Sequence, residues 1–371
     1  MKRFIAALFF FAIVPGTTGH GALTPPHMVR VALLKGVESV RIGGDGVLAV
    51  DQDGIPLDIE GQLLVKRSKD GLLVKGRVLK SLKASAPASL QVNGKGYRGS
   101  IEVSLVDKGL LVVDELPLEE YLVGLINCEI SSQWPIEAIK AQAVIARSYA
   151  LYQMEARRNA LYQLESSVMD QVYDGCDIED SRAARGVRET AGEVLTFDGK
   201  IIQAFYHSSC GGHTEASENV WGYPLPYLEG VECTYCLTAG AGKWDQVMPV
   251  KKIEAFLKNS GYPVAGLREI KVGRRNKSGR LNDLTLISSR GSTIISAVNF
   301  RKAIGYSVIK STNLDVKMSG DEVIFSGVGY GHGVGLCQWG AKQRADDGFS
   351  YREILAYYYP GTQLERLYSE Q

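Results

Sequence analysis

Three short segments of the sequence hold the side chains that could do chemistry. The first is a cluster in which Cys210 and His213 are followed by the pair Cys233 and Cys236. Two pairs of sulfur and nitrogen ligands at this spacing are typical of a closed, tetrahedral structural zinc (Zn²⁺) site, with His207 as an alternative ligand. Two other interpretations stay open: a Cys233–Cys236 disulfide, or unpaired thiols in the core.

The second segment contains Glu129, which helical spacing places beside apolar residues. Leu122 and Leu125 precede it by seven and four positions, so on a helix starting at Pro117 the three side chains share a face. An apolar setting favours the protonated form of a carboxyl group, which suits a general acid. The alternative is a helix that ends at Cys128 and leaves Glu129 solvated in the following turn.

The third segment is the glycine-rich run from Val328 to Ala341, where glycines alternate with Tyr330, His332 and Val334. Such a run either lets the backbone approach a ligand closely or forms a structural turn around a packed His332. It is not a phosphate loop, because no Gly-Lys-Ser/Thr follows. It also lacks the strand-then-helix context of a dinucleotide site.

The elements that must position these segments are mixed in type. Residues 23–113 show β patterns, with clean alternation over residues 100–106. Helical spacing begins at Pro117 and again at Pro135. Short helices and strands follow without βαβ alternation, so the sequence predicts an α+β core over residues 114–366. A β-hairpin pattern indicates an inserted α/β subregion at about residues 245–320.

Composition and charge exclude several classes of protein. The chain has 371 residues, of which 45% are hydrophobic and 22% charged, so we expect a globular protein. Its formal net charge of +1 lacks the basic excess of a nucleic-acid binder. Residues 1–22 have the pattern of a secretory signal peptide, in which the apolar run 4–14 is too short for a membrane span. We therefore expect a secreted, periplasmic or cell-envelope protein, with an uncleaved anchor as the alternative.

Seven blocks, in order over roughly residues 100–365, resemble the stage II sporulation protein D (SpoIID) family, which includes the amidase enhancer LytB. Seven blocks in one order are much more specific than any single block. The blocks are residues 115–125, 134–150, 171–173, 190–195, 206–215, 328–341 and 358–362.

The resemblance implies a peptidoglycan lytic transglycosylase with a SpoIID-like catalytic core. Such enzymes cut the bond between N-acetylmuramic acid and N-acetylglucosamine without water and leave a 1,6-anhydro end. The family's catalytic glutamate corresponds to Glu129, which would act first as a general acid and then as a base. The resemblance also implies glycan contacts from Tyr206, Tyr330, His332 and Gln338, although Tyr206 is equally compatible with a core tyrosine.

A second function is compatible with the same resemblance: a non-catalytic glycan-binding module that enhances a cell-wall amidase. A carboxyl group at position 129 in a buried pocket favours the enzyme. The implied partners are peptidoglycan strands, including strands stripped of stem peptides, and a cell-wall amidase. Arg147 is interpreted as a residue that holds the fold. The pairing of Cys128, Cys176 and Cys337 stays open.

Overall fold

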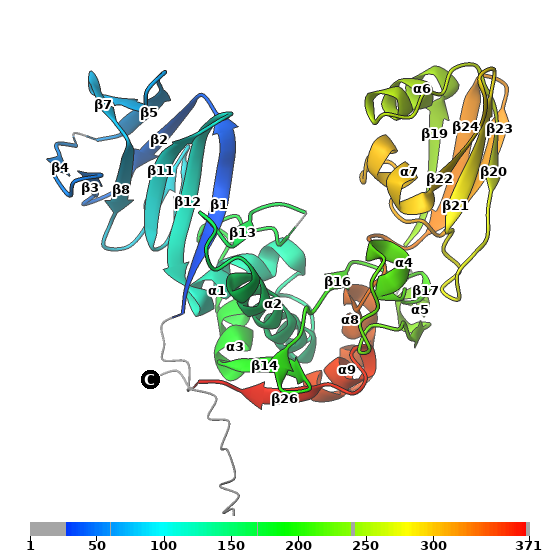
Figure 1. Cartoon of the computed structure of the whole chain (residues 1–371). Coiled ribbons are helices and arrows are strands. Elements are labelled where there is room, and N and C mark those ends of the chain that lie inside the picture. Colours follow the sequence, from blue (N-terminus) through cyan, green and yellow to red (C-terminus); the bar gives the residue numbers. More distant parts are fainter. Residues whose placement is uncertain (1–26, 60, 169, 239–241, 369–371) are drawn as a thin grey trace, which may run out of the picture.

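A computed structural model describes residues 27–368 of the chain, except residues 60, 169 and 239–241. The predicted signal peptide therefore lies outside the described residues. Within them, helices alternate with several β-sheets, which confirms the predicted α+β class. Figure 1 shows a helical centre with a β-rich region rising on either side of it.

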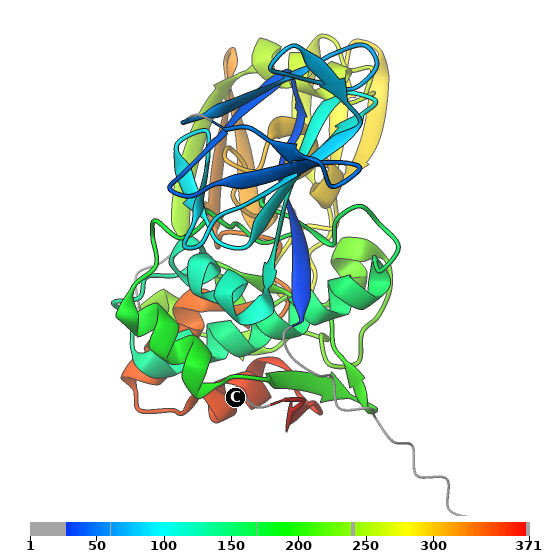
Figure 2. The same cartoon turned by 90° about the vertical axis from the view of Figure 1, so that its left-hand side faces the viewer.

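The first β-rich region contains two sheets that share one hydrophobic core. Their strand orders are β13-β1-β12-β11-β8-β3-β4 and β10-β9-β2-β5-β6-β7. In β11 the alternate side chains Ile101 and Val103 are buried, as the sequence alternation predicts. Figure 2 shows these sheets in front of the molecule, above the helices. The strands are β1 (Met28–Val37), β2 (Ser39–Gly43), β3 (Leu48–Asp51), β4 (Pro56–Leu57), β5 (Leu63–Arg67), β6 (Leu72–Val74), β7 (Arg77–Leu79), β8 (Ser81–Ser85), β9 (Leu90–Val92), β10 (Lys95–Tyr97), β11 (Ser100–Val106) and β12 (Gly109–Pro117).

The helical centre begins where β12 ends. Pro117 and Pro135 stand immediately before the first two helices, where a missing backbone N–H costs nothing. No described helix has both the length and the apolar character needed to span a membrane. The elements of this centre are α1 (Leu118–Glu129), α2 (Ile136–Ala156), β13 (Leu164–Glu165), α3 (Ser181–Glu189), β14 (Glu193–Phe197), β15 (Lys200–Ile201), α8 (Gln338–Asp346), α9 (Tyr351–Tyr358) and β26 (Gln363–Arg366).

Arg147 on α2 is fully buried and binds α1 through its guanidinium. Its guanidinium donates two hydrogen bonds of 2.7 Å to the carboxylate of Glu119, and others to the carbonyl oxygens of Val187 and Glu193. Tyr368 donates to the same carboxylate at 2.7 Å. Removing one partner of such a pair would leave a buried charge uncompensated. Arg147 therefore serves the fold, as the sequence indicated.

The second β-rich region encloses a hydrophobic core of its own, between Trp244 and Phe325. Two three-stranded sheets, β19-β24-β23 and β20-β21-β22, pack with two helices around it. The hairpin predicted inside this part of the sequence corresponds to β20 and β21. The elements are β19 (Lys243–Pro249), α6 (Val250–Asn259), β20 (Leu267–Val272), β21 (Asp283–Ser288), β22 (Gly291–Ser296), α7 (Ala297–Ile304), β23 (Leu314–Ser319) and β24 (Glu322–Val328).

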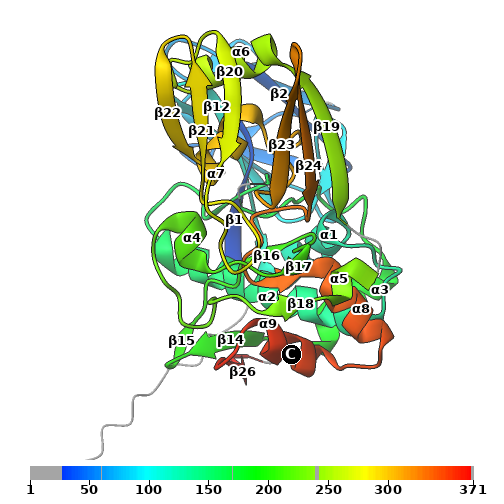
Figure 3. The same ribbon diagram turned by 90° about the vertical axis from the view of Figure 1, so that its right-hand side faces the viewer.

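Short elements between the helical centre and this region carry the remaining site segments. Two residues of β16 pair in parallel with two residues of β25, and β17 pairs with β18. Figure 3 shows them below the second β-rich region. They are β16 (Tyr206–His207), β17 (Gly212–His213), α4 (Ser217–Trp221), β18 (Glu232–Cys233), α5 (Tyr235–Thr238) and β25 (Leu336–Cys337).

We expect Asp114→Asn to flatten the pH dependence of stability. Asp114 on β12 has no exposed surface, and its Oδ2 accepts a hydrogen bond of 3.2 Å from Tyr173. Burial raises its pKa well above the usual 3.8, so the folded state keeps a proton that the unfolded state releases. Wild-type stability should therefore fall as the pH rises above about 4, by up to about 1.4 kcal/mol per pH unit.

Urea unfolding of both proteins between pH 5 and 8 tests this expectation. Asn keeps the shape of the side chain but cannot ionise, so its free energy of unfolding should change less with pH. Parallel curves for the two proteins would contradict the raised pKa of Asp114.

Candidate active site and sulfur cluster

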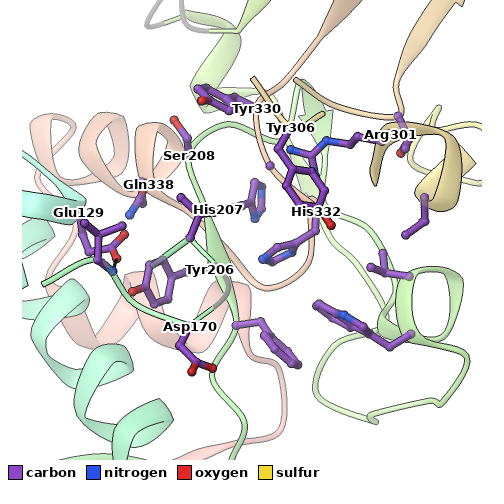
Figure 4. Close-up of a pocket in the computed structure, with 18 of the residues that line it drawn as sticks. Glu129, Asp170, Tyr206, His207, Ser208, Arg301, Tyr306, Tyr330, His332 and Gln338 are labelled. Atoms are coloured by element: carbon purple, nitrogen blue, oxygen red, sulfur yellow. Dashed lines mark hydrogen bonds between the residues drawn. The ribbon is translucent and has the colours of Figure 1, made fainter. Parts of the chain in front are cut away.

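A cavity of about 590 Å³ lies between the helical centre and the second β-rich region. Glu129 and Gln338 line one end, and Arg301 and Tyr306 line the other. Figure 4 shows Tyr206 and two histidines between these ends. A cavity of this size lies within the range of about 300–1,000 Å³ that is typical of ligand-binding sites.

Glu129 is the last residue of α1, because the backbone becomes extended at Ile130. The helix thus continues one residue beyond Cys128, and the side chain is partly buried rather than solvated. Its Oε1 accepts the backbone N–H of Val172 at 3.0 Å. Burial raises the pKa of Glu129, and hydrogen bonds to the charged form offset part of that rise. A carboxyl group held in this way can both give up and take back a proton.

Tyr206 and Gln338 face Glu129 from the cavity wall and favour its charged form. The Tyr206 hydroxyl accepts the amide of Gln171 at 3.2 Å, so its own proton is directed to the carboxylate. The buried Gln171 in turn accepts the hydroxyl of Tyr121 at 3.1 Å. Burial and the charge of Glu129 raise the pKa of Tyr206 well above its usual value, which keeps the donor protonated. We did not identify Gln171 as a site residue from the sequence, although it falls in one of the seven blocks.

Asp170 is a second carboxylate in the cavity wall, and sequence reasoning missed it. Arg157 binds it through two hydrogen bonds of 2.8 and 3.1 Å, and Tyr149 donates to it at 2.9 Å. The backbone N–H of Glu165 completes the set at 2.9 Å. The carboxylate of Asp170 is therefore held in one orientation by donors from three residues. Spacing alone could not reveal it, since Arg157 lies beyond the end of α2.

His332 is held as a neutral imidazole. Its Nδ1 accepts the backbone N–H of Val334 at 3.1 Å, so the ring's proton sits on the other nitrogen. Burial, with the positive charges of Arg301 and Arg280, lowers the pKa of His332 to about 3. The ring lies 5.2 Å from that of Trp221. It is therefore placed to exchange hydrogen bonds without carrying charge.

The structure brings all five residues predicted for catalysis and glycan contact to one cavity. Tyr330 lines it with 45% of its surface exposed. Tyr206 is partly buried and lines the cavity beside Glu129, so its side chain is not enclosed in the core. The five residues are Glu129, Tyr206, Tyr330, His332 and Gln338.

Arg301 on α7 supplies a positive charge at the far end of the cavity. Its Nε donates to the carbonyl oxygen of Ile309 at 2.8 Å, and its guanidinium lies 4.6 Å from the ring centre of Tyr306. Burial lowers its pKa to about 10, so it stays charged at neutral pH. It forms no ion pair with any described residue. No sequence signal places α7 in the wall of the cavity that contains Glu129, and Arg301 was missed for that reason.

Four buried cysteines form a second cluster, with their sulfur atoms within 4.8 Å of one another. Three of them are the predicted ligands Cys210, Cys233 and Cys236, but the fourth is Cys337 instead of His213. His213 lies outside the cluster, with its Nδ1 2.6 Å from the carbonyl oxygen of Thr214. The parallel pairing of β16 with β25 brings Cys337 to this place, which local spacing could not reveal.

The cluster has the chemistry of a metal site. Tetrahedral Zn²⁺, with Zn–S bonds of about 2.3 Å, spaces its sulfurs about 3.8 Å apart. The four sulfurs of the cluster lie within 4.8 Å of one another, which is close to that spacing. Backbone N–H groups of Gly340 and Cys210 both lie 3.3 Å from the Cys337 sulfur, as donors to a thiolate would. All six cysteines are free, so the structure does not contain the Cys233–Cys236 disulfide.

Three other cysteine and histidine residues lie outside the cluster. His207, the alternative ligand, bonds the carbonyl oxygen of Val334 through Nδ1 at 3.1 Å and lines the cavity instead. Cys128 and Cys176 are partly buried.

Two family models match separate parts of the chain, and relatives match longer stretches of it. A family model described as stage II sporulation protein matches residues 106–197, and one described as a domain of unknown function (DUF8618) matches residues 240–335. An uncharacterized protein of Brachyspira hyodysenteriae is 32% identical over 307 residues, which cover 82% of this chain and 81% of that protein.

Two named relatives come from Bacillus subtilis. The amidase enhancer is 32% identical over 288 residues, which cover 66% of this chain and 40% of that protein. Stage II sporulation protein D is 28% identical over 275 residues, which cover 68% of this chain and 75% of that protein.

Proposed function

We propose, on the premise that the chain belongs to the stage II sporulation protein D family, that it is a peptidoglycan lytic transglycosylase acting in the cell envelope. The observation that carries the proposal is Glu129, a partly buried carboxyl group with a raised pKa in the wall of a cavity of about 590 Å³. The N-terminal signal pattern supports a location outside the cytoplasm.

The reaction needs one group that acts twice. Glu129 donates its proton to the glycosidic oxygen as the bond from C1 of the muramic sugar breaks. The resulting carboxylate, stabilised by Tyr206 and Gln338, takes the proton of the C6 hydroxyl as that oxygen closes onto C1. No water is consumed, and the product is a 1,6-anhydro end. Ordinary glycosidases need two carboxylates, whereas here the substrate supplies the nucleophile.

A non-catalytic glycan-binding role beside an amidase is the second candidate, and the relative named amidase enhancer favours it. The same cavity would serve either role. The raised pKa of Glu129 favours the enzyme, because a binding module needs no proton donor.

We expect Glu129→Gln to abolish glycan cleavage. The amide keeps the shape of the side chain but cannot deliver a proton, so formation of 1,6-anhydro ends should fall by about 100- to 10,000-fold. Mass spectrometry of digested glycan strands measures the ends, and co-sedimentation measures binding, which should persist. Glu120→Gln, on the exposed side of the same helix, is the matched control. Cleavage at the wild-type rate, or products with reducing ends, would contradict the proposal.

Arg301 supports strands stripped of stem peptides as the preferred substrate. The lactyl carboxylate of a muramic sugar is blocked by an amide bond while the stem is attached, and it becomes an anion when the stem is removed. Arg301 has no acidic partner among the described residues, so such a carboxylate would supply one. A hydrogen bond to a charged group contributes about 1.5–3 kcal/mol.

We expect Arg301→Met to remove a preference for stripped strands. The ratio of kcat/KM for stripped to stem-bearing strands should fall by about 10- to 100-fold, as loss of a charged hydrogen bond implies. Lys302→Met, an exposed neighbour on α7, should leave the ratio unchanged. An unaltered ratio in Arg301→Met would exclude this role.

We infer further that the cluster of Cys210, Cys233, Cys236 and Cys337 holds one structural Zn²⁺. Four thiolates close the coordination shell, so the ion would stabilise the fold and leave no position for a reacting water. Cys337→Ser should therefore lower both zinc content and melting temperature, whereas His213→Ala should preserve zinc content. Elemental analysis with thermal unfolding measures the two effects. Zinc lost in His213→Ala but kept in Cys337→Ser would restore the ligand set expected from the sequence.

A further inference from the structure

Arg280 is a buried positive charge between the sulfur cluster and the cavity. It lies in the loop that joins β20 to β21, which reaches down to β17 (Figure 3), and only 1% of its surface is exposed. One terminal nitrogen donates to the carbonyl oxygen of His213 at 3.3 Å. Its Nε and its other terminal nitrogen are buried without a hydrogen-bond partner among the described residues. Arginine keeps its proton in proteins, so this charge needs negative charge nearby.

The nearby carboxylate, Glu215, does not contact it. Glu215 is 3% exposed, and its two oxygens are occupied by neutral donors. Asn276 and Ser278, from the same loop as Arg280, donate to Oε2 at 2.9 and 2.7 Å. Asn219 donates to Oε1 at 2.8 Å. Glu215 therefore forms no hydrogen bond with the Arg280 guanidinium, and other groups must balance its charge.

Strand β17 connects Arg280 to the sulfur cluster. The backbone N–H of Gly212 lies 3.4 Å from the sulfur of Cys210, and the carbonyl oxygen of the next residue, His213, accepts the hydrogen bond from Arg280. Burial lowers the pKa of Arg280, and negative charge on Glu215 and on the sulfurs of Cys210, Cys337 and Cys236 offsets part of that fall. Four thiolates around a divalent cation carry a net charge of −2, so a cation beside them offsets part of that charge. A neutral side chain at this position would leave the whole charge buried.

The glycine-rich loop connects Arg280 to the cavity. A Cβ atom on Gly333 would stand 2.4 Å from the Arg280 guanidinium carbon, so only glycine allows this approach. Gly333 adjoins His332, and its carbonyl oxygen accepts the N–H of Glu215 at 2.8 Å. The positive charge of Arg280 also contributes to the lowered pKa of His332. One side chain therefore contacts the glycine loop and lies within electrostatic range of the cluster.

We propose that Arg280 is a positioning residue that balances the charge of a four-thiolate metal centre and, through Gly333, links metal loading to the loop that carries His332. The proposal rests on the metal site inferred above and not on the glycan chemistry. The ligand is a divalent cation, with Zn²⁺ as the probe.

The first test measures zinc affinity of the full chain by competition with a chromophoric chelator. Arg280→Met should lower the affinity by about 10- to 100-fold, the usual cost of losing a group that supports metal ligands. Arg280→Lys restores the charge and should recover most of the affinity. Arg275→Met, in the same loop but paired with Asp315 at 2.6 Å, should match the wild type. Wild-type affinity in Arg280→Met would overturn the proposal, whereas a wild type that binds no zinc would overturn the metal site itself.

The second test needs no variant, so a folding defect cannot obscure it. Hydrogen exchange of the wild-type chain is compared with and without the chelator. Removal of zinc should speed exchange at residues 276–281 and 329–334 before it affects the sheets of residues 28–117. Unchanged exchange at both loops after complete loss of zinc would overturn the link.

Discussion

The parallel pairing of two short strands is the constraint on which both sites depend. Tyr206 pairs with Leu336, and His207 pairs with Cys337, although about 130 residues separate them. A Cβ atom on Gly335 would stand 1.9 Å from the carbonyl oxygen of Phe205, so the strands approach this closely only because that residue is glycine. The pairing sets Tyr206 beside Gln338 on the cavity side and delivers Cys337 to the sulfur cluster.

Two opposing effects set the pKa of Glu129 in the candidate active site. Burial favours the neutral acid, whereas the N–H of Val172 and the side chains of Tyr206 and Gln338 favour the carboxylate. In the proposed reaction, a site with burial alone would hold the proton too firmly to give it to the glycosidic oxygen. A site with the hydrogen bonds alone would lack a proton at the start. Hydrogen bonds from Tyr121 to Gln171 and from Gln171 to Tyr206 hold the Tyr206 hydroxyl in position beside Glu129.

Sequence reasoning succeeded where the cause is local. The prolines before α1 and α2 mark helix starts, alternation marks β11, and helical spacing finds Glu129, because each follows from a few neighbouring residues. It failed for Cys337 and Arg301, whose positions depend on strands and helices that meet only in the folded chain. His213 shows the same limit, since its spacing from Cys210 suits a metal while its side chain bonds elsewhere. The resemblance supplied the residues proposed for glycan contact, which local patterns left open and which the structure places in one cavity.

The second β-rich region builds one wall of the cavity yet packs around a separate hydrophobic core. Glu129, the proposed proton donor, stands on α1 of the helical centre, whose packing does not involve that core. Substitutions inside the second region can therefore reshape the cavity wall while the chemistry keeps its setting. For the proposed enzyme, this separation would let selection change substrate preference among descendants while the reaction stays the same.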